Sequence, residues 1–115
     1  MSPGKRNDRV APPAAPGQWE LRFASSEAGK GWDELCQQAP GNTLKAWEAI
    51  RADPRPIPPT ERQHRLKGRD LGTVNGLEQW QYEVTGGGRI WYLIDPDKKT
   101  IWIRHAGTGH PRATD

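Results

Sequence analysis

The sequence predicts an α+β fold of two layers, in which an N-terminal strand and a two-helix hairpin precede an antiparallel β-meander of three to four strands. Three observations predict it. Apolar residues alternate with charged ones early in the chain, recur at helical spacing in its middle, and alternate again in its last third. Because the apolar stripes of the helices need a partner, we expect them to cover one face of the sheet and leave the other open.

One domain accounts for the chain, because a length of 115 residues rarely splits into two. Residues 1–17 are basic and rich in Pro and Ala, and Val10 is their only large aliphatic side chain after Met1. Such a segment cannot bury enough apolar surface to offset its ordering entropy. We therefore expect a disordered tail over 1–17 and a single folded domain, ending in a short tail, over 18–115.

The first strand is predicted at residues 19–23, and the serine pair at 25–26 can cap the helix that follows. Cys36 falls on the apolar stripe of this helix, so we expect a buried, inert thiol. The Pro-Gly pair at 40–41 ends the helix, and Asn42 or Thr43 can cap a second one. That helix presents Leu44, Trp47 and Ile50 on one face and stops at the Asp-Pro pair at 53–54.

Four strands are predicted in the last half of the chain, at residues 64–67, 79–85, 89–94 and 100–105, with turns at 86–88 and 95–98. Strand parity assigns Ile90, Ile101 and His105 to the helix-covered face, so we interpret His105 as a core histidine. The side chains expected on the open face are Arg89, Trp91, Leu93, Trp102 and Arg104. Aromatic rings mixed with arginines suit nucleic acid, although a second core patch or a groove for a partner protein stays an alternative.

Net charge is +3, and the basic residues concentrate between positions 55 and 70. That block contains Arg55, Arg62, His64, Arg65, Lys67 and Arg69 against only Glu61 and Asp70. Such a block suits a phosphate backbone, with a solvated loop as the alternative. No apolar stretch is long enough to cross a membrane and no signal-peptide core is present, so we expect a cytoplasmic protein. No ligand spacing indicates a metal, and no motif indicates a cofactor.

Several short motifs together resemble the RelE/ParE toxin superfamily over residues 19–112. Residues 88–95 (GRIWYLID) are similar to a family strand in which an arginine is followed by alternating apolar and aromatic residues. Residues 66–68 (LKG) resemble the motif before the family's sheet. Residues 80–84 (WQYEV) and 108–110 (TGH) fall where members carry an aromatic segment and a histidine near the chain end.

The resemblance implies a toxin of a toxin–antitoxin pair that cleaves mRNA on the ribosome without a metal or cofactor and is inhibited by a cognate antitoxin. It implies that Arg89 holds the scissile phosphate, that His64 is the general base, and that His110 is the general acid. Histidine suits these roles because its unperturbed pKa lies near neutrality. The remaining residues implied to bind RNA are Arg65, Lys67, Arg69, Trp91, Arg104 and Arg112.

Two positions depart from the family pattern, because Gln81 and Glu83 stand where the RelE branch has lysines. Glu83 is a candidate base beside Arg89, although a structural ion pair between the two is the favoured interpretation. Two alternatives to the nuclease therefore stay open. One is a ParE-like toxin that inhibits DNA gyrase and cuts nothing, and the other is a non-catalytic RNA-binding or interaction module.

Overall fold

The computed structural model describes residues 4–10, 13–68 and 70–108. Two helices follow one strand and precede five more, so helices and strands are segregated along the chain and the expected α+β class is confirmed. The elements in chain order are β1 (Glu20–Phe23), α1 (Ser26–Gln38), α2 (Pro40–Ala52), β2 (Gln63–Arg65), β3 (Thr73–Val74), β4 (Leu77–Glu83), β5 (Arg89–Asp95) and β6 (Thr100–Gly107).

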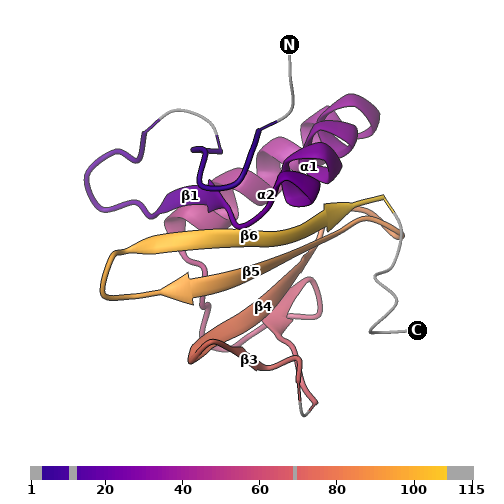
Figure 1. Ribbon diagram of the computed structural model, residues 1–115. Coiled ribbons are helices and arrows are strands. Elements are labelled where there is room, and N and C mark those ends of the chain that lie inside the picture. Colours follow the sequence, from indigo (N-terminus) through magenta and orange to yellow (C-terminus); the bar gives the residue numbers. More distant parts are fainter. Residues whose placement is uncertain (1–3, 11–12, 69, 109–115) are drawn as a thin grey trace.

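All six strands belong to one mixed sheet with the order β1-β6-β5-β4-β2, and β3 pairs with β4 outside this path. β4, β5 and β6 form the expected antiparallel meander. β1 lies parallel to β6. This pairing was not predicted, because it joins segments from the two ends of the folded chain. Figure 1 shows β1 at the edge of the sheet beside β6, with the helix pair on one side of the sheet.

The boundary between the two helices differs from the expected one. α1 begins as predicted, with the Ser25 hydroxyl accepting a hydrogen bond from the Ala28 backbone N–H at 3.1 Å. Pro40 does not end it but starts α2, and Ala39 alone separates the two helices. Proline suits a first helical position because that residue has no intrahelical N–H bond to lose. Thr43 therefore lies inside α2, where its hydroxyl donates to the Leu35 carbonyl at 3.0 Å.

The buried stripes of the helices are narrower than predicted. Leu35 is fully buried, but Cys36 is exposed, since the next residue of a helix points about a quarter-turn away. Partial burial, followed by the charge of Asp33, raises the pKa of the Cys36 thiol, so the thiolate is not favoured. On α2 the buried residues include Ala46 and Ile50, whereas Leu44 is exposed. The predictions of a buried Cys36 and Leu44 were wrong.

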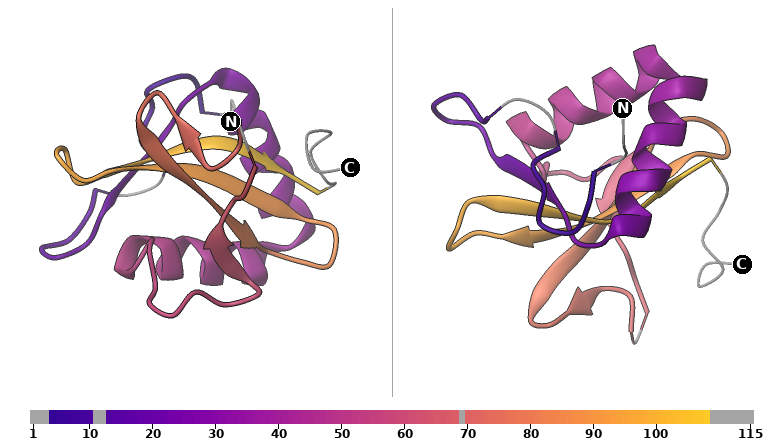
Figure 2. Two further views of the ribbon diagram at one scale, coloured as in Figure 1. Left: turned by 90° about the horizontal axis from the view of Figure 1, so that it is seen from below. Right: turned by 45° about the horizontal axis from the view of Figure 1, so that its top comes forward.

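Glycine allows α1 to lie directly on the sheet. A Cβ built at Gly31 would come within 1.6 Å of the Ala106 carbonyl oxygen on β6, so only a residue without a side chain fits there. Figure 2 shows α1 crossing over the sheet on the side where α2 also packs. The glycine that weakens the helix by propensity is thus required by the packing between helix and sheet.

The N-terminal segment was expected to be disordered, but residues 4–10 pack along the free edge of β1. The Asn7 N–H donates to the Phe23 carbonyl at 2.7 Å and the Val10 N–H to the Leu21 carbonyl at 2.8 Å. Val10 is only 3% exposed and belongs to the main core. One aliphatic side chain plus strand-like hydrogen bonds to an otherwise open edge are enough to order this segment.

A short hairpin joins β3 to β4 and was not predicted. Its turn consists of Asn75 and Gly76, both with positive φ, at 52° and 82°. An Asn-Gly pair with this conformation is a strong hairpin signal, so the sequence contained the information. Within the described residues, neither helix is sufficiently long and apolar to span a membrane.

Candidate functional site

Strand pairing divides the sheet side chains into a helix-covered face and a helix-free face. Ile90, Tyr92 and Ile103 lie in the core with the helices. Cross-strand partners share a face, so the register places Arg89 with Glu83, Trp91 with Gln81, and Leu93 with Trp102 on the other side. The helix-free face as defined here comprises Arg89, Trp91 and Leu93 of β5, Gln79, Gln81 and Glu83 of β4, His64 of β2, and Trp102, Arg104, His105 and Gly107 of β6.

A β-bulge changes which β6 residues belong to this face. Trp91 pairs with His105 whereas Tyr92 pairs with Ile103, so Arg104 is an extra residue on β6. The bulge reverses the strand parity that was used to assign His105 to the core. His105 instead stands on the helix-free face, with its ring edge-on to Trp91 at a centroid distance of 5.9 Å. The prediction of a core histidine packed with the isoleucines was wrong.

The imidazole of His105 is the unusual polar group of this face. Its Nε2 is shielded from solvent and has no hydrogen-bond partner among the described residues. Burial lowers the pKa of His105, so the neutral ring is favoured near neutral pH. Gly107 has no side chain, which leaves space beside this nitrogen. A Cβ at position 107 would fill that space and lie 3.4 Å from Nε2. An unsatisfied buried nitrogen is uncommon and is often functional.

Arg89 lies near the His105 imidazole. Its register partner on β6 is Gly107, two residues from His105 on the same face. Its guanidinium is buried and donates to the carbonyls of Thr85 at 2.9 Å and Gly88 at 3.0 Å, which holds the 85–88 turn. It also forms an ion pair with Glu83 at 3.6 Å, which agrees with the structural ion pair favoured from the sequence. Arg89 therefore has a structural role in addition to the phosphate-binding role that was predicted for it.

The aromatic residues of the face are less open than expected. Trp91 is 6% exposed, and its indole N–H donates to the side-chain oxygen Oε1 of Gln81 at 2.8 Å, so little of its ring can stack on a base. Trp102 is half-buried and offers more surface. Arg104 is exposed and reaches the Gln79 side-chain oxygen at 3.5 Å, at the weak limit of a hydrogen bond.

His64 stands at the far edge of the same face, opposite Gln81. Its Nδ1 lies 3.1 Å from the Glu61 carbonyl oxygen and faces the loop before β2 rather than the Arg89 side of the sheet. A cavity of about 500 Å³ adjoins it, lined by Pro59, Thr60, Glu61, His64, Arg65 and Lys67.

The other predicted RNA-binding residues fall into three groups. Arg65 is used locally, with its guanidinium donating to the Gly72 carbonyl and the Thr73 hydroxyl. Lys67 is exposed at the cavity beside His64. His110, Arg69 and Arg112 lie outside the described residues, so a convergence of positions 64, 89 and 110 on one phosphate stays a prediction.

The position of His105 on the helix-free face was not predicted, although the sequence contains a signal for it. The β6 sequence reads apolar at 101 and 103, but the alternation fails at the polar pair 104–105 and resumes one position late at Ala106, which is buried. Two polar residues in succession inside an alternating strand indicate a bulge.

The helix-free face thus brings together a neutral imidazole, an ion pair and an exposed arginine. Such a set can accept a proton and stabilise an anion. Among the described residues, no group of three His, Cys, Asp or Glu side chains could hold a metal ion. Comparison with protein-family models, curated proteins and solved structures gives no match to this chain.

Proposed function

We propose that this chain is an endoribonuclease that cleaves single-stranded mRNA at its helix-free face and acts as the toxin of a toxin–antitoxin pair. The observation that carries the proposal is the neutral imidazole of His105, which has no partner among the described residues and lies two residues along β6 from Gly107, the register partner of Arg89 in the Arg89–Glu83 ion pair. The order of strand, helix pair and meander supports the likeness to the RelE/ParE superfamily, as does the strand conformation of residues 89–95 within the 88–95 motif.

The chemistry follows from these side chains. His105 Nε2 takes the proton of a ribose 2′-hydroxyl, and the 2′-oxygen attacks the adjacent phosphorus. Charge builds on the phosphate oxygens, where the guanidinium groups of Arg89 and Arg104 supply positive potential. The bond from phosphorus to the 5′-oxygen breaks, and that oxygen takes a proton from a general acid, for which His110 is the sequence candidate. The products are a 2′,3′-cyclic phosphate and a 5′-hydroxyl end.

His105 replaces His64 as the base in this proposal. His64 Nδ1 is engaged with the carbonyl groups of the 60–61 loop, whereas His105 Nε2 has no partner among the described residues. Gly107 lies where a reacting hydroxyl must approach, since a methyl group there would contact Nε2 without clashing. His64 and Lys67, at the neighbouring cavity, are then assigned to binding the flanking nucleotides.

The decisive experiment measures cleavage of a single-stranded RNA, and of a translated mRNA by primer extension, with purified protein in chelator. We expect wild-type cleavage with cyclic-phosphate products. His105→Asn should lose about 10²–10⁴-fold in rate, which is the usual contribution of one acid–base group. Gly107→Ala should also lose activity because its methyl group occupies the approach to Nε2.

Matched controls separate this result from misfolding. Gly41→Ala places a methyl group in open space on α2 and should leave both cleavage and stability unchanged. If His105→Asn cleaves as fast as wild type, His105 is not the base. If RNA binds but is never cut, the chain is a binding module, and inhibition of DNA gyrase supercoiling instead would identify a ParE-like toxin.

Growth arrest on expression, relieved by an acidic protein encoded next to the gene, tests the toxin–antitoxin part of the proposal separately. A chain that cleaves RNA in vitro but has no such neighbour would be a nuclease outside a toxin–antitoxin pair.

A further inference from the structure

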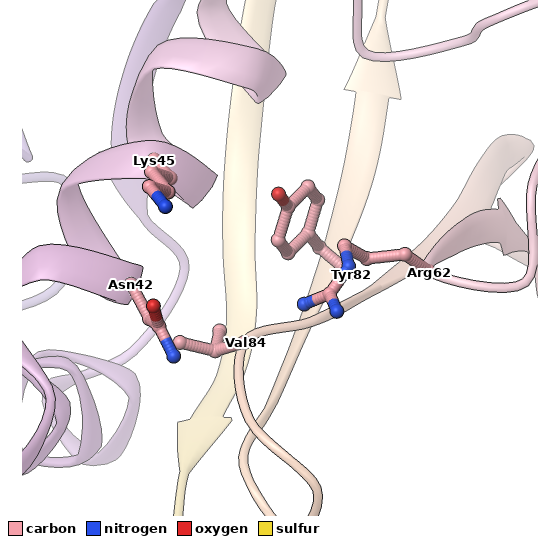
Figure 3. A pocket seen from close by; sticks show the side chains of 5 residues that line it. All are labelled: Asn42, Lys45, Arg62, Tyr82 and Val84. Atoms are coloured by element: carbon pink, nitrogen blue, oxygen red, sulfur yellow. The ribbon is translucent and has the colours of Figure 1, made fainter.

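A second cavity lies on the helix-covered side of the sheet, away from the proposed cleavage face. It has a volume of about 380 Å³ and is lined by Asn42, Lys45, Arg62, Tyr82 and Val84. Figure 3 shows that these side chains come from α2, from the loop before β2 and from the end of β4. No role in the proposed RNA cleavage is assigned to any of them.

Two cations line this cavity without neutralising carboxylates. Among the described residues, neither Lys45 nor Arg62 has a carboxylate within 4.0 Å. One nitrogen of Arg62 donates to the Glu83 carbonyl at 2.9 Å, which holds the guanidinium at the cavity and leaves other donors available. Two cations without a carboxylate partner, one of them held in place by a hydrogen bond, indicate a site for an anion.

The N-terminus of α2 adds to this positive potential. The residue before the helix, Ala39, supplies no side-chain cap, and the first turn contains no acidic residue. The first N–H groups of such a helix carry partial positive charge and favour an anion. Asn42, in the first turn, brings its amide to the cavity wall.

Tyr82 supplies an independent observation. The residue is 8% exposed, so its ring is buried, yet its hydroxyl has no hydrogen-bond partner among the described residues. In Figure 3 the hydroxyl is directed toward α2, and Arg62 lies near the other end of the ring. The hydroxyl oxygen is accessible at the cavity, unlike the shielded Nε2 of His105, so an oxygen of a bound anion can accept its hydrogen bond.

We propose that this cavity binds the phosphate group of a phosphate monoester attached to a small organic body. Arg62, Lys45 and the α2 N-terminus surround a tetrahedral anion from several directions, which suits phosphate better than a planar carboxylate. The volume exceeds that of a bare phosphate, and Val84 with the Tyr82 ring forms an apolar wall for the rest of the ligand. A free mononucleotide and the 5′-phosphate end of an RNA share this chemistry.

Calorimetric titration of the full chain with AMP, adenosine and inorganic phosphate tests the proposal. AMP should bind saturably and adenosine should not, with phosphate competing. Lys45→Gln and Arg62→Gln should each weaken AMP binding about tenfold, the usual loss for one charge-assisted hydrogen bond. Tyr82→Phe should weaken it by a smaller factor. Lys45 is exposed, so Lys45→Gln tests the site without risk to the fold.

Lys98→Gln is the matched control, because it removes an exposed lysine from the turn between β5 and β6, where no role is assigned, and should leave AMP binding unchanged. Tetranucleotides with a 5′-phosphate or a 5′-hydroxyl distinguish an RNA end from a free nucleotide as the source. The proposal is overturned if AMP does not saturate, if adenosine binds as tightly as AMP, or if succinate competes as well as phosphate. It is also overturned if Lys98→Gln weakens binding as much as Lys45→Gln. Loss of RNA cleavage in His105→Asn leaves this result unaffected.

Discussion

The two faces of the sheet are both largely buried along β5, but different interactions hold them. On the helix-covered face, Ile90, Ile101 and Ile103 are fully excluded from solvent and pack with the helices. On the helix-free face, Arg89 and Trp91 are nearly as buried, yet they use hydrogen bonds and an ion pair. On β5 and β6, therefore, the side chains on the helix-covered face are mainly aliphatic, and the opposite face contains more polar groups.

This difference separates stability from chemistry. Burying an isoleucine stabilises a fold by about 1.5–3 kcal/mol, whereas an intramolecular hydrogen bond contributes about 0.5–1.5 kcal/mol net. The aliphatic face therefore carries most of the folding free energy. The polar face contributes less, and it contains the shielded His105 nitrogen that has no partner among the described residues. Polar groups on such a face can exchange protons and stabilise charge, which aliphatic side chains cannot do.

The largest expected effect comes from the aliphatic face. Ile103→Ala should lower the free energy of unfolding by about 2–5 kcal/mol, since it leaves a cavity in a fully buried site. Arg104→Ala, the adjacent residue on the opposite face, should change it by less than about 0.5 kcal/mol. Urea denaturation of both variants checks the pair, and equal losses would contradict the division between the faces.

The contact between α1 and the aliphatic face gives the next largest effect. Gly31→Ala should lower the free energy of unfolding by about 1–3 kcal/mol, because its Cβ would meet the Ala106 carbonyl at 1.6 Å and must push α1 off β6. Gly41→Ala, in open space on α2, is the control. A Gly31→Ala variant more stable than wild type would show that helix propensity outweighs this close packing.

A smaller effect is expected when one hydrogen bond of the polar face is removed. Trp91→Phe loses the bond from the indole N–H to Gln81 and should cost about 0.5–1.5 kcal/mol, plus the apolar area of the lost ring. Thermal denaturation measures it. A loss as large as that of Ile103→Ala would mean that the polar face is a second core.

The smallest expected effect is a change in the pH dependence of stability. Burial lowers the pKa of His105 from the ordinary value of 6.5, so the unfolded chain binds its proton more readily than the folded chain. The contribution of the neutral ring is therefore present above pH 6.5 and lost as pH falls through the folded pKa. His105→Asn should show a shallower fall in Tm than wild type between about pH 7.5 and about pH 5.5. Parallel curves would mean that His105 titrates normally.

A feature of the fold could be predicted when residues close together in the sequence determine it. The Ser25 cap and the glycine turn after β4 follow from neighbouring residues, and both were predicted. The Asn75–Gly76 hairpin is equally local but was overlooked. The predicted start of α2 was wrong, because a proline such as Pro40 can follow the end of one helix or occupy the first position of the next.

The candidate site was predictable only in part. Arg89 and Glu83 were placed together correctly, because their strands meet through a short turn and cross-strand pairing follows from it. His105 was assigned to the wrong face, because a one-residue bulge reverses every side chain that follows it. The ordering of residues 4–10 on the edge of β1 could not be read from their composition either.

By itself, the sequence determined the local elements and the two periodicities that define the α+β class, because capping, turns and alternation act between residues close in the chain. Tertiary structure decided the parallel pairing of β1 with β6, the bulge that brings His105 beside Trp91, and the use of Val10 in the core. Each of these depends on contacts between residues far apart in the chain. The free energy of such contacts exists only once the sheet and helices have assembled.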